Sequence, residues 1–243
     1  MKGIDLAKYC QDLIESTKRN YWRLKKLSKK KLINDDILHL ARKTKTSPVM
    51  VLRKRLKAMG YHNNQIKKMM NLDMNIEIPK DLREDIRSAN KNDPVYSPRG
   101  IEYSHFLGTE GEAIIKQWLE YEGKKYKEDP GNDIVGLPDF LLEEKMRIYN
   151  MKVKWIESKC SYGNLTEQKN NRKQFTKFDK LYGKFGCIVY WLGYDKTKKM
   201  KKRFILTWED MLKLTPTYLH TRIRNLVYEI PEEFEHLLYP TGI

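Results

Sequence analysis

Two acidic residues and a lysine in the middle of the chain have the types and spacing of a metal-dependent catalytic site. Asp139 directly follows a proline at the start of an apolar segment, and Glu157 and Lys159 end another apolar segment. Residues two apart in a strand point to the same face, so Glu157 and Lys159 should lie side by side. Charged side chains are rarely buried without a partner, so such a pair at the end of a core strand needs an explanation.

Asp139 and Glu157 are expected to meet at one edge of a sheet, because neighbouring strands lie about 5 Å apart. Two carboxylates within reach of each other repel unless a cation neutralises them. The side chains of Asp139 and Glu157 provide only oxygen ligands, which favour Mg²⁺ or Mn²⁺ over zinc. The backbone carbonyl of Ser158, between the two charged side chains, is the expected third ligand.

A divalent ion at this place would polarise a phosphodiester oxygen and activate a bound water. Lys159 would orient that water or stabilise charge that develops on the phosphate. Glu112 is expected to reach the ion directly or through water, with Glu110 as the alternative acid on the same helix. The competing interpretation of Glu157 and Lys159 is an exposed surface ion pair, worth only a few tenths of a kcal/mol.

The segments around these residues indicate an α/β domain. An amphipathic helix is predicted over 108–123, and a basic helix over 167–186 carries Arg172, Lys173 and Lys177, which we expect to contact nucleic acid. A further helix is predicted from Thr207, with Asp210 in capping-box spacing. Strands are predicted over the segments 137–145, 146–150, 151–159, 187–194 and 203–207, with turns around Lys145 and Asn150.

The first 90 residues are predicted to be helical. Apolar residues recur at helical spacing over 4–13 and 21–32, and another helix is expected to begin at Asn34 as its N-cap. Ser47 as cap, Pro48 at the first helical position and Gly60 at the end predict the next helix. Together the last two helices form a helix-turn-helix pattern over about 34–60, whose second helix carries Arg53, Lys54, Arg55 and Lys57 as expected nucleic-acid contacts.

The positive charge of the chain is concentrated in its N-terminal third. The net charge is +16, and residues 1–70 hold 19 Lys plus Arg against 5 Asp plus Glu, which is +14. This charge predicts a polyanionic partner. Nucleic acid is favoured over an anionic membrane because the sequence lacks an aromatic membrane-facing stripe. A solvated lysine-rich surface is the alternative.

Composition excludes several classes of protein. With 40% hydrophobic and 33% charged residues, the chain reads as a globular protein with a heavily charged surface. No apolar run approaches the roughly 18–20 residues of a membrane span, and the N-terminus lacks the apolar core of a signal peptide, so we expect an intracellular protein, cytoplasmic or nuclear. Three cysteines without a CxxC pair and five scattered histidines support neither a zinc site nor a disulfide framework.

A linker is predicted between the helical region and the α/β domain. Residues 71–100 contain Pro79, Pro94, Pro98 and Gly100 around one short helix. We therefore expect a basic helical DNA-binding region over 1–92 and a nuclease domain over 93–243.

The order of the acids resembles that of the PD-(D/E)xK nuclease superfamily, which includes archaeal Holliday-junction resolvases and many restriction endonucleases. "LPDFLL", "WIESKCSYG", "KQF" and "IVYWLGY" are together similar to the motifs of its TPD-motif family of codanin-interacting nuclease-like proteins. The likeness covers roughly residues 94–194. Leu137 stands where the signature has Thr, but it should point away from Asp139, and the tail from about 195 has no counterpart.

This resemblance implies a restriction-endonuclease-like fold, a mixed β-sheet flanked by helices. It also implies catalytic roles for Asp139, Glu157 and Lys159, the role of the helix acid for Glu112, and a position lining the site for Gln174. The expected function is metal-dependent cleavage of structured DNA, branched or single-stranded, in repair or recombination. A non-catalytic DNA-binding adaptor that holds a partner protein and an RNA nuclease are the alternatives, and a homodimer is expected only by analogy with resolvases.

Overall fold

A computed structural model describes residues 3–73, 75–128, 136–195 and 203–238. These residues form two compact units. The sheet unit comprises residues 3–7 and 106–230, and the helical unit comprises residues 8–105 and 231–238. The boundary at 92/93 expected from the sequence stays a prediction.

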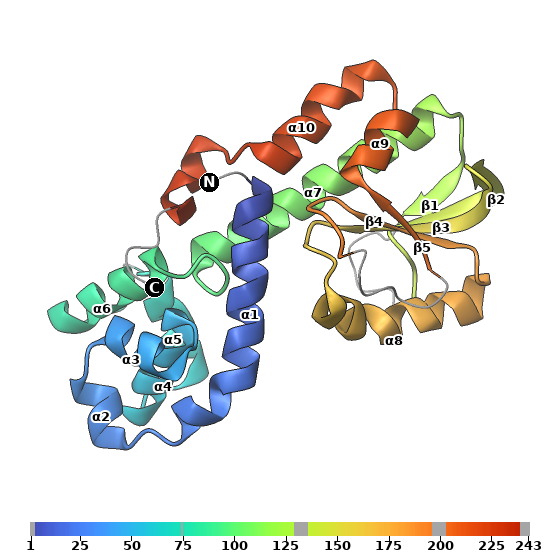
Figure 1. Ribbon diagram of the computed structural model, residues 1–243. Coiled ribbons are helices and arrows are strands. Elements are labelled where there is room, and N and C mark those ends of the chain that lie inside the picture. The colour runs from blue at the N-terminus through green and yellow to red at the C-terminus, as the bar shows by residue number, and fades with distance from the viewer. Residues whose placement is uncertain (1–2, 74, 129–135, 196–202, 239–243) are drawn as a thin grey trace. The chain divides into compact units, whose positions relative to one another are not determined.

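The sheet unit is built on a mixed sheet of five strands in the described part of the chain, with the order β1-β2-β3-β4-β5 (Figure 1). β1, β2 and β3 pair antiparallel, whereas β3, β4 and β5 run parallel. This mixed α+β architecture confirms the predicted fold class. The strands span Tyr126–Glu128, Phe140–Ile148, Met151–Lys159, Gly186–Tyr190 and Phe204–Thr207.

Helices cover both faces of this sheet. α8 (Leu165–Tyr182) is the crossover between the parallel strands β3 and β4, and it packs Phe175 and Phe178 against the buried Trp155. α7 (Pro98–Tyr121) and α9 (Trp208–Leu214) lie on the other face (Figure 1). The unit continues through the 3₁₀ turn η1 (Thr217–Leu219) into α10 (His220–Tyr228). Both the basic helix and the helix capped by Thr207 are confirmed.

The strand prediction is wrong in one place and incomplete in another. Residues 137–150 were expected to form two strands with a turn around Lys145, but β2 runs without a break to Ile148. Its register against β3 shifts between Leu141 and Met146, so the exposed charges there sit on an irregularity within one strand. The turn before β3 is confirmed, with Tyr149 at φ 48°. β1, which is only three residues long, was not predicted from the sequence.

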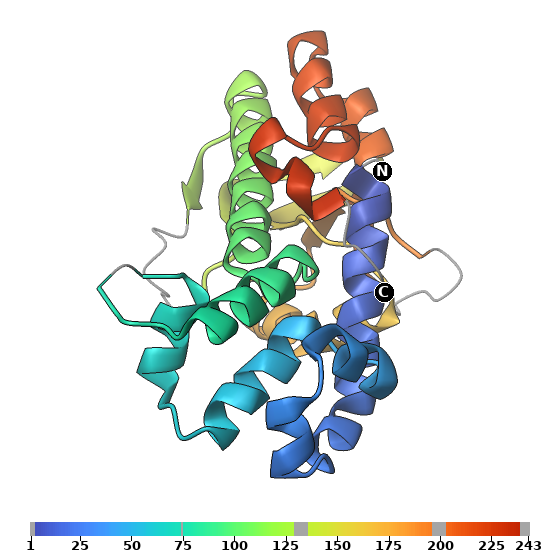
Figure 2. The ribbon, with the colours of Figure 1, turned by 90° about the vertical axis from the view of Figure 1, so that its left-hand side faces the viewer.

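The secondary structure in the described residues of the helical unit is all helical, as predicted for the first 90 residues. α4 contacts α2, α3, α5 and α6, and Figure 2 shows this cluster from a second side. Leu40, Leu52, Leu56 and Ile86 are fully buried at its centre. Within the described residues, no helix is long and apolar enough to cross a membrane. The helices span Gly3–Lys25 (α1, which begins in the sheet unit), Lys29–Asn34 (α2), Ile37–Thr44 (α3), Pro48–Ala58 (α4), Asn63–Met70 (α5) and Lys80–Lys91 (α6), and η2 spans Glu232–Leu238.

The start of α4 is confirmed and the start of α3 is corrected. Ser47 caps α4 by accepting a hydrogen bond from the Met50 N–H at 3.2 Å, and Pro48 is the first helical residue. Asn34 is not the N-cap of α3, because it is the last residue of α2. Asp36 is the cap, and its Oδ1 accepts from the His39 N–H at 2.6 Å. Two acids in a row left this cap ambiguous in the sequence.

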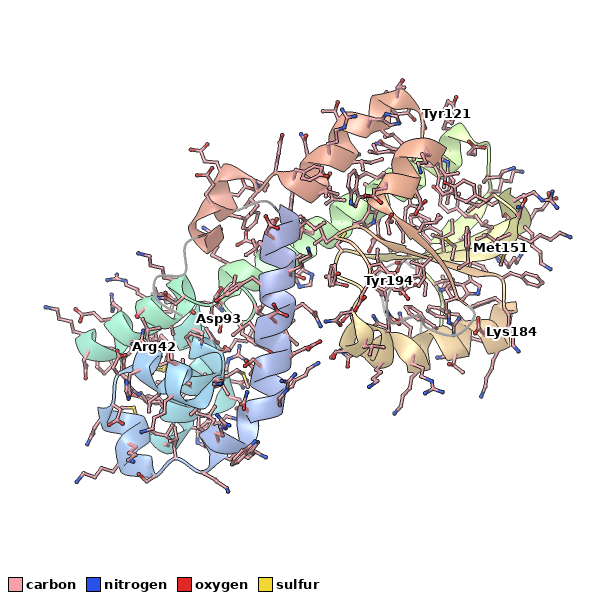
Figure 3. The ribbon with its side chains drawn as sticks, viewed as in Figure 1. Arg42, Asp93, Tyr121, Met151, Lys184 and Tyr194 are labelled. Atoms are coloured by element: carbon pink, nitrogen blue, oxygen red, sulfur yellow. The ribbon has the colours of Figure 1, made fainter. Side chains whose placement is uncertain are left out.

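The linker predicted over 71–100 is wrong, because most of this segment is packed. α6 buries Leu82, Ile86 and Ala89 in the core of the helical unit. Pro98 starts α7 rather than interrupting a loop, and Ser97 Oγ accepts from the Gly100 N–H at 3.0 Å. Asp93, between α6 and α7, lies buried among these helices (Figure 3). Pro79 and Pro98 therefore mark helix starts inside a compact unit.

Candidate functional site

The sheet register brings Asp139 and Glu157 together. Phe140 pairs with Ile156 at the start of β2, so Asp139, one residue earlier, lies opposite Glu157. The Asp139 N–H donates to Glu157 Oε2 at 3.3 Å, and the Ser158 N–H donates to Asp139 Oδ2 at 2.7 Å. Each acid is thus tied to the neighbouring strand through a backbone N–H, which fixes both carboxylates at this edge.

Lys159 forms an ion pair with Glu157 in the same place. The Lys159 Nζ lies 2.7 Å from Glu157 Oε1, and the two side chains are 21% and 1% exposed. This burial contradicts the interpretation as an exposed surface pair. Removing two charged groups from water is costly unless they are closely paired. A sheet with only a structural role would not need this buried ion pair.

Gln174 completes the set of donors around Glu157. It lies on α8, whose N-terminus is capped by Asn164, and its Nε2 donates to Glu157 Oε1 at 2.9 Å. Gln174 itself is largely exposed, whereas Glu157 is buried. The amide therefore stands between the carboxylate and solvent, at the open side of the site.

The environment raises the pKa of both members of the ion pair. Burial raises the pKa of Glu157, and the opposing effect of Lys159 does not cancel it. Burial alone would lower the pKa of the Lys159 amine, but the attraction and hydrogen bond of Glu157, together with Asp139, raise it above its usual range. Lys159 therefore stays positively charged at neutral pH, beside a carboxylate that binds protons more readily than usual.

Glu112 approaches this site because α7 packs closely on the sheet at Gly111. A Cβ built on Gly111 would lie 2.6 Å from both Cys160 Sγ and Trp191 Nε1. Glu112 is exposed on the next position, and its charge contributes to raising the pKa of Glu157. Glu110 pairs instead with Arg222, at 2.9 and 3.1 Å. The geometry therefore favours Glu112 over Glu110 as the helix acid.

Two of the contacts that support this site were not predicted from the sequence. Trp191 is fully buried, and its Nε1 donates to Ser158 Oγ at 2.9 Å. The close approach at Gly111 was likewise not foreseen. The only available signal was the pair of glycines in "GTEGE", inside a helix that otherwise favours larger residues.

The basic residues of α8 surround Gln174 on the helix. Arg172 and Lys173 are exposed, while Lys177 is half-buried. The Lys177 Cε lies 2.9 Å from where a Cβ on Gly136 would be, next to the segment that leads into Asp139. These side chains provide positive charge along the helix that carries Gln174.

On α4 the structure separates Arg55 from the other basic residues. Arg53 and Lys57 are exposed and Lys54 is half-buried, but Arg55 is 5% exposed. Its Nε donates to the Leu32 carbonyl at 2.6 Å, and its other nitrogens bind the Asp35 carbonyl and the Asp85 carboxylate. The prediction that Arg55 contacts nucleic acid is wrong, because its side chain is used inside the helical unit.

The donor set at the sheet edge fits a hard divalent ion. A strand residue directs its N–H and C=O to the same side, so the Ser158 carbonyl faces the side of Asp139, which its N–H contacts. Two carboxylates and a carbonyl are ligands that Mg²⁺ and Mn²⁺ accept. Within the described residues, no three His, Cys, Asp or Glu side chains form a group that would hold a metal. An ion here would thus keep water molecules, as Mg²⁺ commonly does.

Comparison with known families identifies the segment that contains this site. A family model described as "Protein of unknown function TPD sequence-motif" matches residues 78–210, more than half of the chain. The match includes both acids, Lys159 and Gln174. No solved structure matches the chain.

Curated proteins similar to the chain carry a nuclease name. "CDAN1-interacting nuclease 1" from Xenopus tropicalis is 25% identical over 169 residues, which are 65% of this chain and 55% of that protein. The Danio rerio protein of the same name is 27% identical over 119 residues, 46% of this chain and 39% of that protein. The human one is 26% identical over 108 residues, 42% and 38% of the two chains. The chain thus spans about half the length, or less, of these relatives.

Proposed function

Since this chain belongs to the TPD family, we propose that it is a nuclease that hydrolyses phosphodiester bonds in DNA with Mg²⁺ or Mn²⁺. One observation carries the proposal: the buried Glu157 carboxylate lies opposite Asp139 and is held by Lys159 at 2.7 Å. The nuclease name of the relatives supports the same class of reaction.

The metal ligands proposed are the carboxylates of Asp139 and Glu157, the Ser158 carbonyl and, directly or through water, Glu112. When bound, the ion would polarise a phosphate oxygen and supply a water of lowered pKa as the nucleophile for phosphorus. Asp139 and Glu157 are suited to this because backbone N–H groups already fix their orientation.

Lys159 supplies a positive charge that does not depend on the ion. Its amine stays protonated because Glu157 and Asp139 raise its pKa. An ammonium held beside the reacting phosphate stabilises the charge that develops there, and its hydrogen atoms can orient the attacking water. Gln174 holds the Glu157 carboxylate from the side of α8, so that the carboxylate does not turn toward solvent.

DNA is the proposed substrate because exposed cations flank the site on α8 and occur again on α4. Arg172, Lys173, Arg53 and Lys57 are exposed. The proposed phosphate contacts are Arg172 and Lys173 next to Gln174, and Arg53 and Lys57 at the helix-turn-helix. Such contacts position a strand without reading its sequence. A preference for branched or single-stranded DNA and a role in repair or recombination are part of this proposal.

A protein partner is also proposed. The relatives are named as interacting with CDAN1, and a protein of that class is the partner to test for this chain. A homodimer is a separate prediction, based on the need of resolvase-like enzymes to cut two strands.

Cleavage of labelled DNA tests the proposal. Wild-type protein is incubated with duplex, flapped, branched and single-stranded DNA, and with RNA of the same sequence, in Mg²⁺ and in Mn²⁺. We expect ion-dependent cutting of DNA that falls by about 100-fold or more in Glu157→Gln and in Lys159→Met. Glu143→Gln, an exposed acid on β2, is the matched control.

Three outcomes would contradict the proposal. Cutting at the wild-type rate by both Glu157→Gln and Lys159→Met would remove the assigned site. DNA binding without cutting of any substrate would leave a non-catalytic adaptor, and cutting of RNA alone would leave an RNA nuclease.

A further inference from the structure

The helical unit contains a cavity of about 540 Å³ that the proposed catalytic chemistry does not use. All of its lining residues lie between Tyr21 and Ile101, so the cavity belongs to the helical unit alone. Its volume is in the range of about 300–1,000 Å³ that is usual for sites that bind small molecules.

One wall of the cavity is a single face of α4. Met50, Arg53, Lys54 and Lys57 line it, and their spacing of three, four and seven residues puts them on one stripe of the helix. Between them, Val51, Leu52 and Leu56 point into the core of the unit. α4 therefore has an apolar face that holds it in place and a basic face that is directed into the cavity.

A second wall repeats this pattern on α5. Asn63, Ile66, Lys67 and Met70 line the cavity at the same spacing. Ile66 and Met70 are buried and form the apolar base of the cavity, whereas Lys67 is exposed. The two helices together surround an apolar base with charged side chains.

The charge of the cavity is entirely positive. Arg53, Lys54, Lys57 and Lys67 line it without any Asp or Glu. No ion pair is formed by these four side chains with the described residues. Four cations without counter-charges around one hollow favour a bound anion.

Two tyrosines line the remaining wall, together with Pro98 and Ile101. Tyr21 of α1 and Tyr96 before α7 both line the cavity and are half-buried. Lys25 Nζ, also on α1, lies 5.4 Å from the centre of the Tyr21 ring. This cation–π contact stabilises the position of the ring. Together with the methionines, the tyrosines offer the flat apolar surface on which a planar ring can stack.

We propose that this cavity binds one unpaired nucleotide of a DNA strand, with its phosphates on the lysines and Arg53 and its base against the tyrosines. The combination of cations with aromatic side chains is the general way in which proteins hold single-stranded nucleic acid. Paired bases are stacked inside a duplex and cannot enter a hollow, so a duplex would reach only the rim. The inference rests on the proposed function in that DNA is the substrate, and it adds why unpaired DNA would be preferred.

Binding measured without a divalent ion separates this inference from catalysis. The full chain in EDTA is titrated into fluorescently labelled 20-base-pair DNA, and anisotropy gives Kd. Three versions are compared: a perfect duplex, the same duplex with one extra unpaired nucleotide, and one whose unpaired position lacks its base. We expect the unpaired nucleotide to tighten binding by about fivefold or more, and removal of its base to abolish this gain.

Variants test whether the cavity causes the preference. Lys54→Gln/Lys57→Gln should weaken binding and reduce the slope of log K against log salt by about 1 to 2, since each lost phosphate contact contributes about 0.9. Lys29→Gln/Lys30→Gln on α2 removes the same charge outside the cavity and should keep the preference. Tyr21→Ala should lose the preference and Tyr21→Phe, which keeps the ring, should retain it.

The outcomes are distinguishable. Equal Kd values for the three DNA versions, or an unchanged preference in Lys54→Gln/Lys57→Gln, would overturn the inference and leave the nuclease proposal standing. Absence of cleavage with a retained preference would overturn the nuclease proposal alone. No binding to any of the DNA molecules would remove both the nucleotide site and DNA as the substrate.

Discussion

The side-chain amide of Gln174 donates a hydrogen bond to Glu157 Oε1 at 2.9 Å and so joins α8 to the end of β3. Lys159 Nζ approaches the same oxygen at 2.7 Å, and the Asp139 N–H contacts the other one. One carboxylate thus receives a helix amide, an ammonium and a backbone N–H. This arrangement selects one orientation of Glu157, which is what a metal-binding or catalytic carboxylate needs.

Replacing Gln174 should reduce the rate without unfolding the protein. In Gln174→Ala, Glu157 loses one donor and gains freedom to turn, so we expect DNA cleavage to slow by about tenfold. Single-turnover cleavage in Mn²⁺ measures the rate, and a thermal melt checks the fold. Thr176→Ala, an exposed neighbour on α8, is the control, and an equal loss in both variants would contradict a specific role for Gln174.

Gly111→Ala should damage the site through packing alone. The new Cβ would lie 2.6 Å from Cys160 Sγ and Trp191 Nε1, so α7 or Trp191 must move, at a cost of about 1–3 kcal/mol. Both Glu112 and the hydrogen bond from Trp191 to Ser158 depend on this contact. We expect a lower melting temperature and at least tenfold slower cleavage, by an order-of-magnitude estimate.

Gly108→Ala is the matched control for that variant. Nothing lies within 4 Å of a Cβ at Gly108, three residues earlier on the same helix. Alanine there should leave cleavage unchanged and stabilise the helix by up to about 1 kcal/mol. If Gly111→Ala behaved like Gly108→Ala, the close approach of α7 would not matter to the site.

The stability of the chain should depend on pH through Asp93. Burial raises the pKa of this carboxyl, although Ser47 and the N–H groups of Val49, Val95 and Tyr96 oppose the shift. A carboxyl whose folded pKa lies above its unfolded value stabilises the fold below the unfolded pKa and loses that contribution as pH rises through the folded pKa. The nearby Cys10 thiol, whose pKa burial raises to about 12, stays neutral throughout.

Asp93→Asn should remove this pH dependence. Urea unfolding followed by circular dichroism between pH 4 and pH 8 gives the free energy of unfolding of both proteins. We expect the wild-type value to fall relative to that of the variant as pH rises above about 4, close to the ordinary pKa of Asp. Parallel curves would show that Asp93 ionises in the folded state as easily as in the unfolded one. Asp81→Asn, an exposed acid on α6, controls for the loss of one charge.

Loss of Arg55 should lower the stability of the protein, whereas loss of Arg53 should weaken its binding to DNA. Arg55→Ala leaves the Asp85 carboxylate and two carbonyls without their donor, so we expect a loss of about 3 kcal/mol in stability. Arg53→Ala removes an exposed cation and should leave the melting temperature unchanged while weakening DNA binding. Thermal melts and DNA titrations of both variants check this, and equal melting temperatures would contradict the structural role of Arg55.

Much of the fold followed from local signals in the sequence. Ser47 and Pro48 mark the start of α4, and the strands predicted over 151–159 and 187–194 are the parallel strands β3 and β4, although β4 already ends at Tyr190. The placement of Asp139 opposite Glu157 followed from the same segments, because strand spacing brings such ends together. These features are encoded by residues close to one another in the chain.

The features that were missed depend on distant parts of the chain. Whether Arg55 points inward is decided by the carbonyls of α2 and by Asp85 of α6, which a helix pattern does not reveal. Pro98 can end a linker or begin a helix, and the buried contacts of Asp93 decide between the two. The unbroken β2 was likewise hidden, since the charged residues 143–145 look like a turn until β3 pairs beside them.

The most direct test of the proposed catalytic site is the binding of Mn²⁺ in the absence of DNA. Isothermal titration calorimetry of the wild-type chain, Asp139→Asn and Glu157→Gln gives the affinity and stoichiometry of the ion, with Glu143→Gln as control. We predict that the wild type and the control bind Mn²⁺ alike and that each site variant binds about tenfold more weakly or not at all. Equal Mn²⁺ affinity in all four proteins would contradict the assignment of Asp139 and Glu157 as the metal ligands of a nuclease.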